Sequence, residues 1–232
     1  EMLRKHERAL TRVVDAYTQN IEHHTPIHPE YVADCLDQVA DESTVFTVDT
    51  GMNNVWAARY LTPNGHRRVI GSFSHGTMAN ALPHAIGAAY AAPDRKVVSL
   101  SGDGGLSMLL GELITVQQHD LPITTVVFNN SSLGMVKLEM MVDGIPAYQT
   151  DHQPVDYSAV ARAVGMRSVR VEAPKDVHEA LREALAADVP YLVDVITDAN
   201  ALSIPSRITA DQVAGFALSA GRTVLKLSLI HI

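Results

Sequence analysis

Residues 97–106 read Val-Val-Ser-Leu-Ser-Gly-Asp-Gly-Gly-Leu, and residues 128–134 read Phe-Asn-Asn-Ser-Ser-Leu-Gly. In each case a short apolar run ends in small or polar residues and continues with helical spacing, which predicts a buried strand leading into a helix. Two such units in succession predict a βαβ crossover between parallel strands. Because the carboxyl ends of these strands open on one edge of the sheet, we expect Asp103 and Asn130 to lie close together there.

That edge is where open α/β sheets bind ligands, and the helix N-termini there offer backbone N–H groups to anions. Gly104 and Gly105 lack a Cβ and therefore allow a diphosphate to approach the backbone closely. A diphosphate needs a counter-cation. The Asp103 carboxylate, the Asn130 amide oxygen, a carbonyl from the turn 131–133 and phosphate oxygens would form an all-oxygen shell suited to Mg²⁺. These residues predict a magnesium diphosphate site.

The pairing of Gly102-Asp103-Gly104 with Asn129-Asn130 resembles the magnesium and diphosphate motif of thiamine-diphosphate enzymes. A lone Gly-Asp-Gly equally marks a tight turn, so its combination with Asn-Asn carries the resemblance. Over about residues 26–222 the chain resembles the C-terminal cofactor domain of the quinone-linked pyruvate dehydrogenase (pyruvate oxidase) family. The segments that carry this wider resemblance are Thr50-Gly51, 55–60, 71–81, 102–108, 127–134 and Ile204-Pro205.

The resemblance implies that thiamine diphosphate and Mg²⁺ are the cofactors. It places Mg²⁺ on Asp103, Asn130 and the carbonyl of Ser132. It also places the backbone of the loop 76–78 against the aminopyrimidine of the cofactor, with Met78 as the apolar wedge that bends it; an ordinary core methionine is the alternative. The implied cofactor-binding residues are Gly76, Thr77, Met78, Asp103, Gly104, Gly105, Asn130, Ser131, Ser132, Leu133, Gly134, Met135 and Val136.

Four further side chains are candidates for the site. Glu139 lies a little over one helical turn beyond Met135, so we expect it to reach the reacting centre as the catalytic residue; an exposed helix glutamate is the alternative. Asp49 follows a predicted strand and either caps a helix or lines the site. His75 either contacts substrate or caps a helix. Trp56, the only tryptophan, is interpreted as a packing residue.

Composition limits the classes of protein. A net charge of −8, without a basic cluster interleaved with aromatic residues, argues against nucleic-acid binding. The single cysteine, Cys35, excludes an internal disulfide and fits a reducing compartment. No apolar run approaches the roughly 20 residues needed to span a bilayer. We therefore expect a cytoplasmic protein, with the resemblance adding a peripheral position on the inner face of the plasma membrane for the full-length enzyme.

Strand and helix patterns alternate along the 232 residues without an internal repeat. This predicts an α/β fold with a single doubly wound, mainly parallel sheet and helices on both faces. The segment 106–119 has helical spacing, and we expect 143–154 to form an irregular flap over the site. We expect residues 1–25 to be a linker arm from a missing upstream domain, 26–208 the thiamine-diphosphate and magnesium domain, and 209–232 a truncated helical tail.

The resemblance implies that the chain is the last third of an enzyme that converts pyruvate to acetate and CO₂. In that family FAD, bound by another domain, passes the electrons to a membrane quinone, and a neighbouring subunit completes the active site. We therefore expect a homo-oligomer, a tetramer by resemblance, and no activity from this chain alone. The alternatives are a fragment of another thiamine-diphosphate 2-oxo-acid enzyme, such as acetolactate synthase or a non-oxidative decarboxylase, and a non-catalytic nucleotide-binding module.

Overall fold

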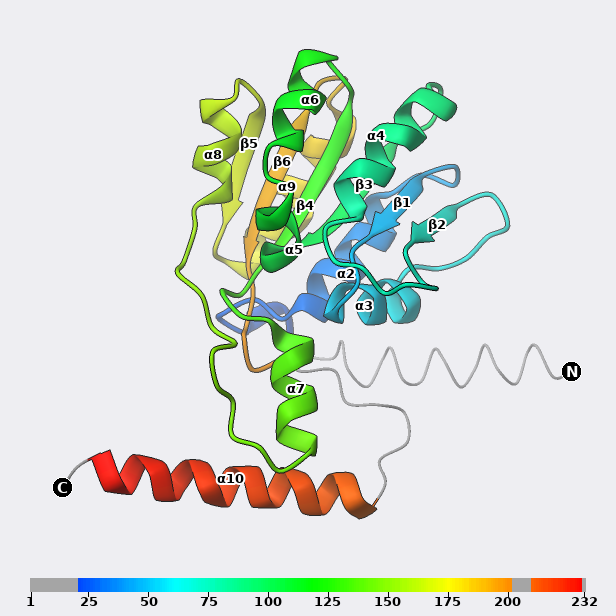
Figure 1. Cartoon of the computed structure of the whole chain (residues 1–232). Helices are drawn as coiled ribbons and strands as arrows, with labels where there is room; N and C mark the ends of the chain where they lie inside the picture. Colours follow the sequence, from blue (N-terminus) through cyan, green and yellow to red (C-terminus); the bar gives the residue numbers. More distant parts are fainter. Residues whose placement is uncertain (1–20, 202–209, 231–232) are drawn as a thin grey trace, which may run out of the picture.

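The computed structural model describes residues 21–201 and 210–230. Within these ranges six strands form one sheet in the order β2-β1-β3-β4-β6-β5, and every neighbouring pair is parallel (Figure 1). The strands are β1 (Val45–Val48), β2 (Arg68–Gly71), β3 (Val97–Gly102), β4 (Ile123–Asn129), β5 (Arg167–Val171) and β6 (Tyr191–Ile196). The predicted single, doubly wound α/β sheet is confirmed.

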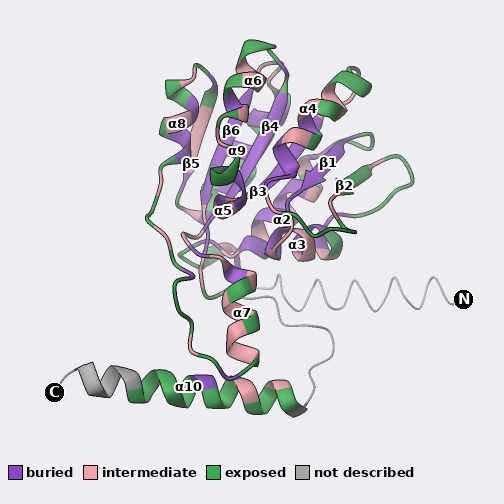
Figure 2. Cartoon of the chain, in the orientation of Figure 1, coloured by how far each residue is buried: buried purple, intermediate pink, exposed green. Residues whose placement is uncertain are grey.

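Helices cover both faces of this sheet. One buried core joins it to α2 (Pro29–Val39), α3 (Met52–Tyr60) and α9 (Pro174–Ala186), and a second core joins it to α4 (Ala81–Ala91), α5 (Asp103–Met108), α6 (Glu112–Gln118) and α8 (Tyr157–Ala163). The remaining elements are the 3₁₀ helix η1 (Ile21–His23), α7 (Gly134–Val142) and α10 (Ala210–Ile230). Because both faces are covered, the central strands β3, β4 and β6 are buried along almost their whole length (Figure 2).

The topology places a ligand crevice between β1 and β3. These two strands are neighbours, but the helix that follows β1, α3, packs on one face of the sheet, whereas α5, which follows β3, packs on the other. In doubly wound sheets this divergence opens a crevice at the carboxyl ends of the strands. Asp49 and Asp103 directly follow these two strand ends.

The segment 106–119, for which the spacing indicates helix, is helical in two pieces separated by a break at residues 109–111. The first, α5, begins already at Asp103 and ends at Met108, because Leu109 leaves the helical conformation with φ −128° and ψ 40°. The second, α6, restarts after Gly111 and buries Leu113 and Val116 in the core beneath it. The break therefore lets one helix begin at the crevice while the other packs on the sheet.

Two helices, α7 and α10, lie away from the sheet. Helix α7 projects beyond the carboxyl edge, and α10 crosses its far end (Figure 1). The crossing is close, because a Cβ at Gly215 would overlap the carbonyl of Val142. Ser219 Oγ also donates to the carbonyl of Ile145 at 3.0 Å, and Arg222 donates to that of Gly144 at 2.7 Å.

Some expectations fall outside the described residues. They include most of the linker arm 1–25, the segment Ile204-Pro205 and both ends of the tail 209–232. The assignment of the three domains stays a prediction. In the part of the chain that the structure covers, none of the helices has the length and apolar character needed to cross a membrane.

Candidate functional site

The two loop tips that follow β3 and β4 meet. Strand pairing sets Gly102 opposite Phe128, so the residues after each strand emerge side by side. Asp103 Oδ2 accepts the backbone N–H of Asn130 at 2.9 Å and that of Ser131 at 2.5 Å. The structure therefore brings Asp103 and Asn130 together at the carboxyl edge of the sheet, as the sequence predicts.

The second tip is braced by its own hydrogen bonds. Asn130 Oδ1 accepts the N–H of Ser132 at 2.9 Å, and the Ser132 carbonyl accepts the N–H of Gly134 at 3.0 Å. Each of these two oxygens retains a second lone pair. Together with the Asp103 carboxylate they form a set of hard oxygen donors of the kind that Mg²⁺ uses when it also keeps waters or phosphate oxygens.

No cluster of three or more His, Cys, Asp or Glu side chains suited to a metal occurs among the described residues. The predicted magnesium site does not require one, because it has a single protein carboxylate and draws its other ligands from amide, carbonyl and phosphate oxygens. Such a site needs the diphosphate to complete it. We therefore expect metal and diphosphate to bind together.

A cleft that is open to solvent lies at this edge of the sheet. It is lined by ten of the predicted cofactor-binding residues: Met78, Asp103, Gly104, Gly105, Asn130, Ser132, Leu133, Gly134, Met135 and Val136. Gly76 and Thr77 are exposed on the loop that leads to Met78, and Ser131 takes part through its N–H to Asp103. Met78 is thus part of the cleft wall.

The lining fits a polar ligand. Four buried polar atoms without a protein partner belong to residues of the cleft wall: Asp49 Oδ2, Asn53 Nδ2, Trp56 Nε1 and Ser132 Oγ. Buried polar atoms are normally paired, so a concentration of unpaired ones at one cleft indicates a missing partner. Gly104 lets Leu133 pack closely against it in the cleft wall, because a Cβ there would lie 2.6 Å from Leu133 Cδ2.

Two helices begin at the cleft. The N–H groups of Met135 and Val136 lie in the first turn of α7, where helix geometry provides no intrahelical acceptor. Helix α5 begins at Asp103 itself. The positive ends of both helix dipoles therefore face the place where a diphosphate would bind. The residues present fit a magnesium diphosphate group on all of these counts.

Asp103 is a buried carboxylate, with 3% of its surface exposed. Burial raises the pKa of Asp103, and the opposing influences are His152 and the N–H groups of the two tips. His152 Nε2 lies 3.5 Å from Asp103 Oδ1. Burial thus disfavours the ionised form of Asp103, and a divalent cation bound to the carboxylate would stabilise that form.

The predicted flap is tied to the second tip. Leu133 N–H donates to the carbonyl of Thr150 at 2.8 Å, His152 N–H donates to that of Ser131 at 2.9 Å, and Ser132 forms an antiparallel bridge with Asp151. Residues 150–152 therefore pair with residues 131–133 and lie beside the second loop tip. Sequence reasoning identified the flap but not its register or the approach of His152 to Asp103.

Two buried residues behind the site were missed from the sequence. Tyr157 Oη donates to the Asp103 carbonyl at 2.9 Å, while Tyr157 N–H donates to Asp194 Oδ2 at 3.0 Å. The other oxygen of Asp194 accepts Asn129 Nδ2 at 2.9 Å. Asp194 thereby links the backs of both loop tips, and burial raises its pKa. The available signal was a single carboxylate within an otherwise apolar strand.

Replacing Tyr157 with Phe tests this support. The change removes the hydrogen bond from the buried phenol to the Asp103 carbonyl, so we expect a loss of about 1–2 kcal/mol in the free energy of unfolding. Thermal unfolding should show a midpoint lower by about 3–6 °C. Tyr90→Phe is the matched control at an exposed ring, and its midpoint should stay close to that of the wild type. Equal midpoints for both variants would contradict the supporting role.

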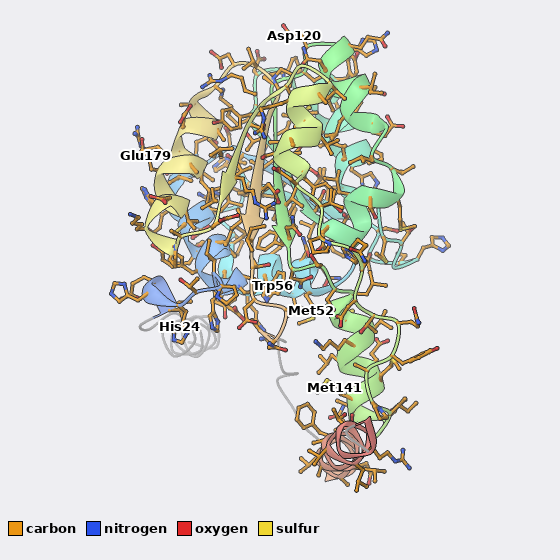
Figure 3. The ribbon with its side chains drawn as sticks, turned by 90° about the vertical axis from the view of Figure 1, so that its left-hand side faces the viewer. His24, Met52, Trp56, Asp120, Met141 and Glu179 are labelled. Carbon is orange, nitrogen blue, oxygen red and sulfur yellow. The ribbon has the colours of Figure 1, made fainter. Side chains whose placement is uncertain are left out.

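The other candidate side chains are placed as follows. Trp56 is 2% exposed and stacks on Phe128 with ring centroids 5.1 Å apart, so it packs as predicted and also forms part of the cleft wall. Figure 3 shows it near the base of α7, with Asp120 at the opposite end of the sheet. Glu139 is exposed on α7 and does not line the cleft, so its catalytic role stays a prediction.

Comparison with known proteins places this geometry in a family. The model of the thiamine pyrophosphate enzyme C-terminal TPP-binding domain matches residues 49–195, which include both loop tips and their strands. The chain belongs to this family. Thiamine pyrophosphate is another name for thiamine diphosphate, so the resemblance to thiamine-diphosphate enzymes is confirmed at the level of the cofactor domain.

The names of individual relatives state either a cofactor or an activity. The chain is 38% identical to YdaP of Bacillus subtilis, named as a thiamine pyrophosphate-containing protein, over 83% of the chain and 33% of the relative. It is 35% identical to an acetolactate synthase large subunit of Methanococcus aeolicus, over 77% of the chain and 31% of the relative. Acetolactate synthase 2 of Zea mays is 33% identical, over 73% of the chain and 28% of the relative.

These relatives refine the expectation drawn from the sequence. The chain spans about a third of their length. Their names support a thiamine pyrophosphate enzyme, but they point to acetolactate synthase and not to an oxidoreductase with FAD and a quinone acceptor. The alternative reading of the sequence is therefore better supported than the main one.

Proposed function

We propose that this chain is the cofactor-binding part of a thiamine-diphosphate enzyme that acts on pyruvate, and that the whole protein makes acetolactate. The main support is the contact between the Asp103 carboxylate and the N–H of Asn130, at 2.9 Å, on the wall of a polar cleft. The names of the relatives favour acetolactate synthesis among the pyruvate reactions considered.

Each part of the cleft then has a task. Asp103, Asn130 and the Ser132 carbonyl would hold Mg²⁺, and the first turn of α7 would donate N–H groups to the diphosphate. The loop 76–78 would carry the ring of the cofactor, with Met78 against it. When bound, thiamine diphosphate supplies the electron sink for loss of CO₂ from a 2-oxo acid. The chain contributes position, charge balance and shelter from water.

A quinone-linked pyruvate dehydrogenase is the second candidate for the whole protein. It is favoured by the resemblance of residues 55–60 and 71–81 to that family. FAD and quinone would then be bound outside this chain, on a homo-oligomer lying against the inner face of the plasma membrane. The longer protein, supplied with pyruvate, FAD, thiamine diphosphate, Mg²⁺ and a quinone, separates the two candidates. Acetolactate as product supports the first, and acetate with stoichiometric quinone reduction supports the second.

The chain alone should bind the cofactor without turning over substrate. In our proposal the groups that activate the cofactor come from the rest of the enzyme and from a neighbouring subunit. Isothermal calorimetry with thiamine diphosphate and Mg²⁺ should therefore show binding, while purified chain mixed with pyruvate should release no CO₂. Steady CO₂ release would contradict this division of labour, and preference for ATP over thiamine diphosphate would favour a nucleotide-binding module instead.

A further inference from the structure

Asp49 is a buried carboxylate to which the proposed mechanism assigns no task. It directly follows β1, is 2% exposed, and lies in the cleft wall between two loops that bind different ends of the cofactor in the proposed function. The first is the loop 76–79, which leads into α4. The second is 102–105, which runs from the last residue of β3 into the first turn of α5. Sequence reasoning offered a helix cap or a site residue for Asp49, and the structure gives it features of both.

One carboxylate oxygen holds the first loop. Asp49 Oδ1 accepts the N–H of Ala81, the first residue of α4, at 2.9 Å. The helix capped in this way is 32 residues further along the chain, not the neighbouring α3. The position of α4, and with it the loop that carries Met78, is therefore fixed relative to the end of β1.

The other oxygen contacts the second loop. A Cβ built on Gly105 would overlap Asp49 Oδ2, so this oxygen lies directly against the Gly105 backbone. The same Cβ position lies 3.4 Å from the backbone nitrogen of Ala79, which shows how closely the two loops approach. Asp49 Oδ2 has no hydrogen-bond partner in the protein. Asp49 thus contacts both loops.

The burial of this group is costly. Desolvation raises the pKa of Asp49 to about 6, so near neutral pH a charge is retained at a place where an apolar side chain of similar size would avoid the penalty. A carboxylate makes both contacts: one oxygen accepts the N–H of Ala81, and the other is small enough to lie against the Gly105 backbone. Gly105 is the complementary feature, because any side chain there would displace the carboxylate.

We propose that Asp49 is a positioning residue that sets the separation between the ring-binding loop 76–79 and the diphosphate-binding loop 102–105. This inference rests on the proposed function, since it assumes that one ligand reaches both loops. When the two loops are held at the right separation, one ligand can contact both at once, and both sets of contacts add to its binding free energy. Replacing Asp49 should therefore weaken the binding of the whole cofactor. The binding of diphosphate alone should not change, because Asp103 and the second loop tip bind it by their own contacts.

The test compares two ligands on the full chain by calorimetry in Mg²⁺: thiamine diphosphate, which spans both loops, and inorganic diphosphate, which occupies only one. We expect Asp49→Ala to weaken thiamine diphosphate binding at least about tenfold while inorganic diphosphate changes by less than about twofold. Asp49→Asn keeps the shape and the acceptor for Ala81, so it should restore thiamine diphosphate affinity to within about threefold of the wild type.

Thr47→Val is the matched control. Thr47 Oγ1 is buried on the same strand and donates to the Ala81 carbonyl at 2.7 Å, so the change loosens the same helix end without touching Gly105. In Thr47→Val the ratio of the affinity for thiamine diphosphate to that for inorganic diphosphate should stay within about twofold of the wild-type ratio. An equal loss for both ligands in Asp49→Ala, no loss at all, or an Asp49→Asn variant as weak as Asp49→Ala would each overturn the proposal. Wild-type chain that binds inorganic diphosphate but not thiamine diphosphate would instead overturn the proposed function, and this inference with it.

Discussion

Replacing Asp103 with Asn should weaken magnesium-dependent binding of thiamine diphosphate by at least about 100-fold. The carboxylate is the only formally charged protein ligand in the proposed shell, and a neutral amide leaves Mg²⁺ without that partner in a buried site. Quenching of Trp56, which lines the cleft and is the only tryptophan, provides a direct signal for titration.

The fold should survive this change. Asn has nearly the shape of Asp and still offers one oxygen to the N–H groups of Asn130 and Ser131. Circular dichroism and thermal unfolding of the unliganded variant are therefore the control for an intact chain. A folded Asp103→Asn variant with unchanged affinity in Mg²⁺ would rule out the ligand role.

Replacing Asp49 with Asn should stabilise the unliganded chain near neutral pH. Burial raises the pKa of Asp49 from its ordinary value of 3.8 to about 6. The folded state therefore binds the proton more tightly than the unfolded state, and stability is lost as pH rises from about 4 to about 6. A shift of this size corresponds to about 3 kcal/mol above pH 6, and the amide avoids most of this cost.

We expect a gain of about 2 kcal/mol at pH 7.5, seen as a midpoint higher by about 4–8 °C, and a smaller gain at pH 4.5. Asp94→Asn is the matched control, because Asp94 is exposed in the turn before β3 and the change keeps the shape of the side chain. Its stability should change by less than about 0.5 kcal/mol. A destabilised Asp49→Asn variant at pH 7.5 would show that the charge itself holds the two loops.

The architecture could be predicted because its signals are local. Apolar β-branched runs mark the central strands, and the prolines at 29 and 174 mark the first residues of α2 and α9. The meeting of Asp103 and Asn130 followed from one rule, that consecutive parallel strands end on the same edge. The break after Met108 was not predictable, because the apolar spacing continues through it and tertiary packing decides where the helix restarts.

The residues that support the site were harder to predict, since each acts across a long stretch of chain. Asp49 holds a helix end 32 residues away, and Tyr157 donates to a carbonyl 54 residues away. Spacing rules describe neighbours on one element and give no information about such pairs. Only the unusual carboxylate at position 194, inside an apolar strand, left a visible trace in the sequence.

Anomalous diffraction from crystals grown with thiamine diphosphate and Mn²⁺ in place of Mg²⁺ would locate the cation directly. We predict one peak at bonding distance from the Asp103 carboxylate, Asn130 Oδ1 and the Ser132 carbonyl, with diphosphate oxygens completing the shell. A cation bound elsewhere, or a cofactor bound in this cleft without any metal on Asp103, would contradict the assignment.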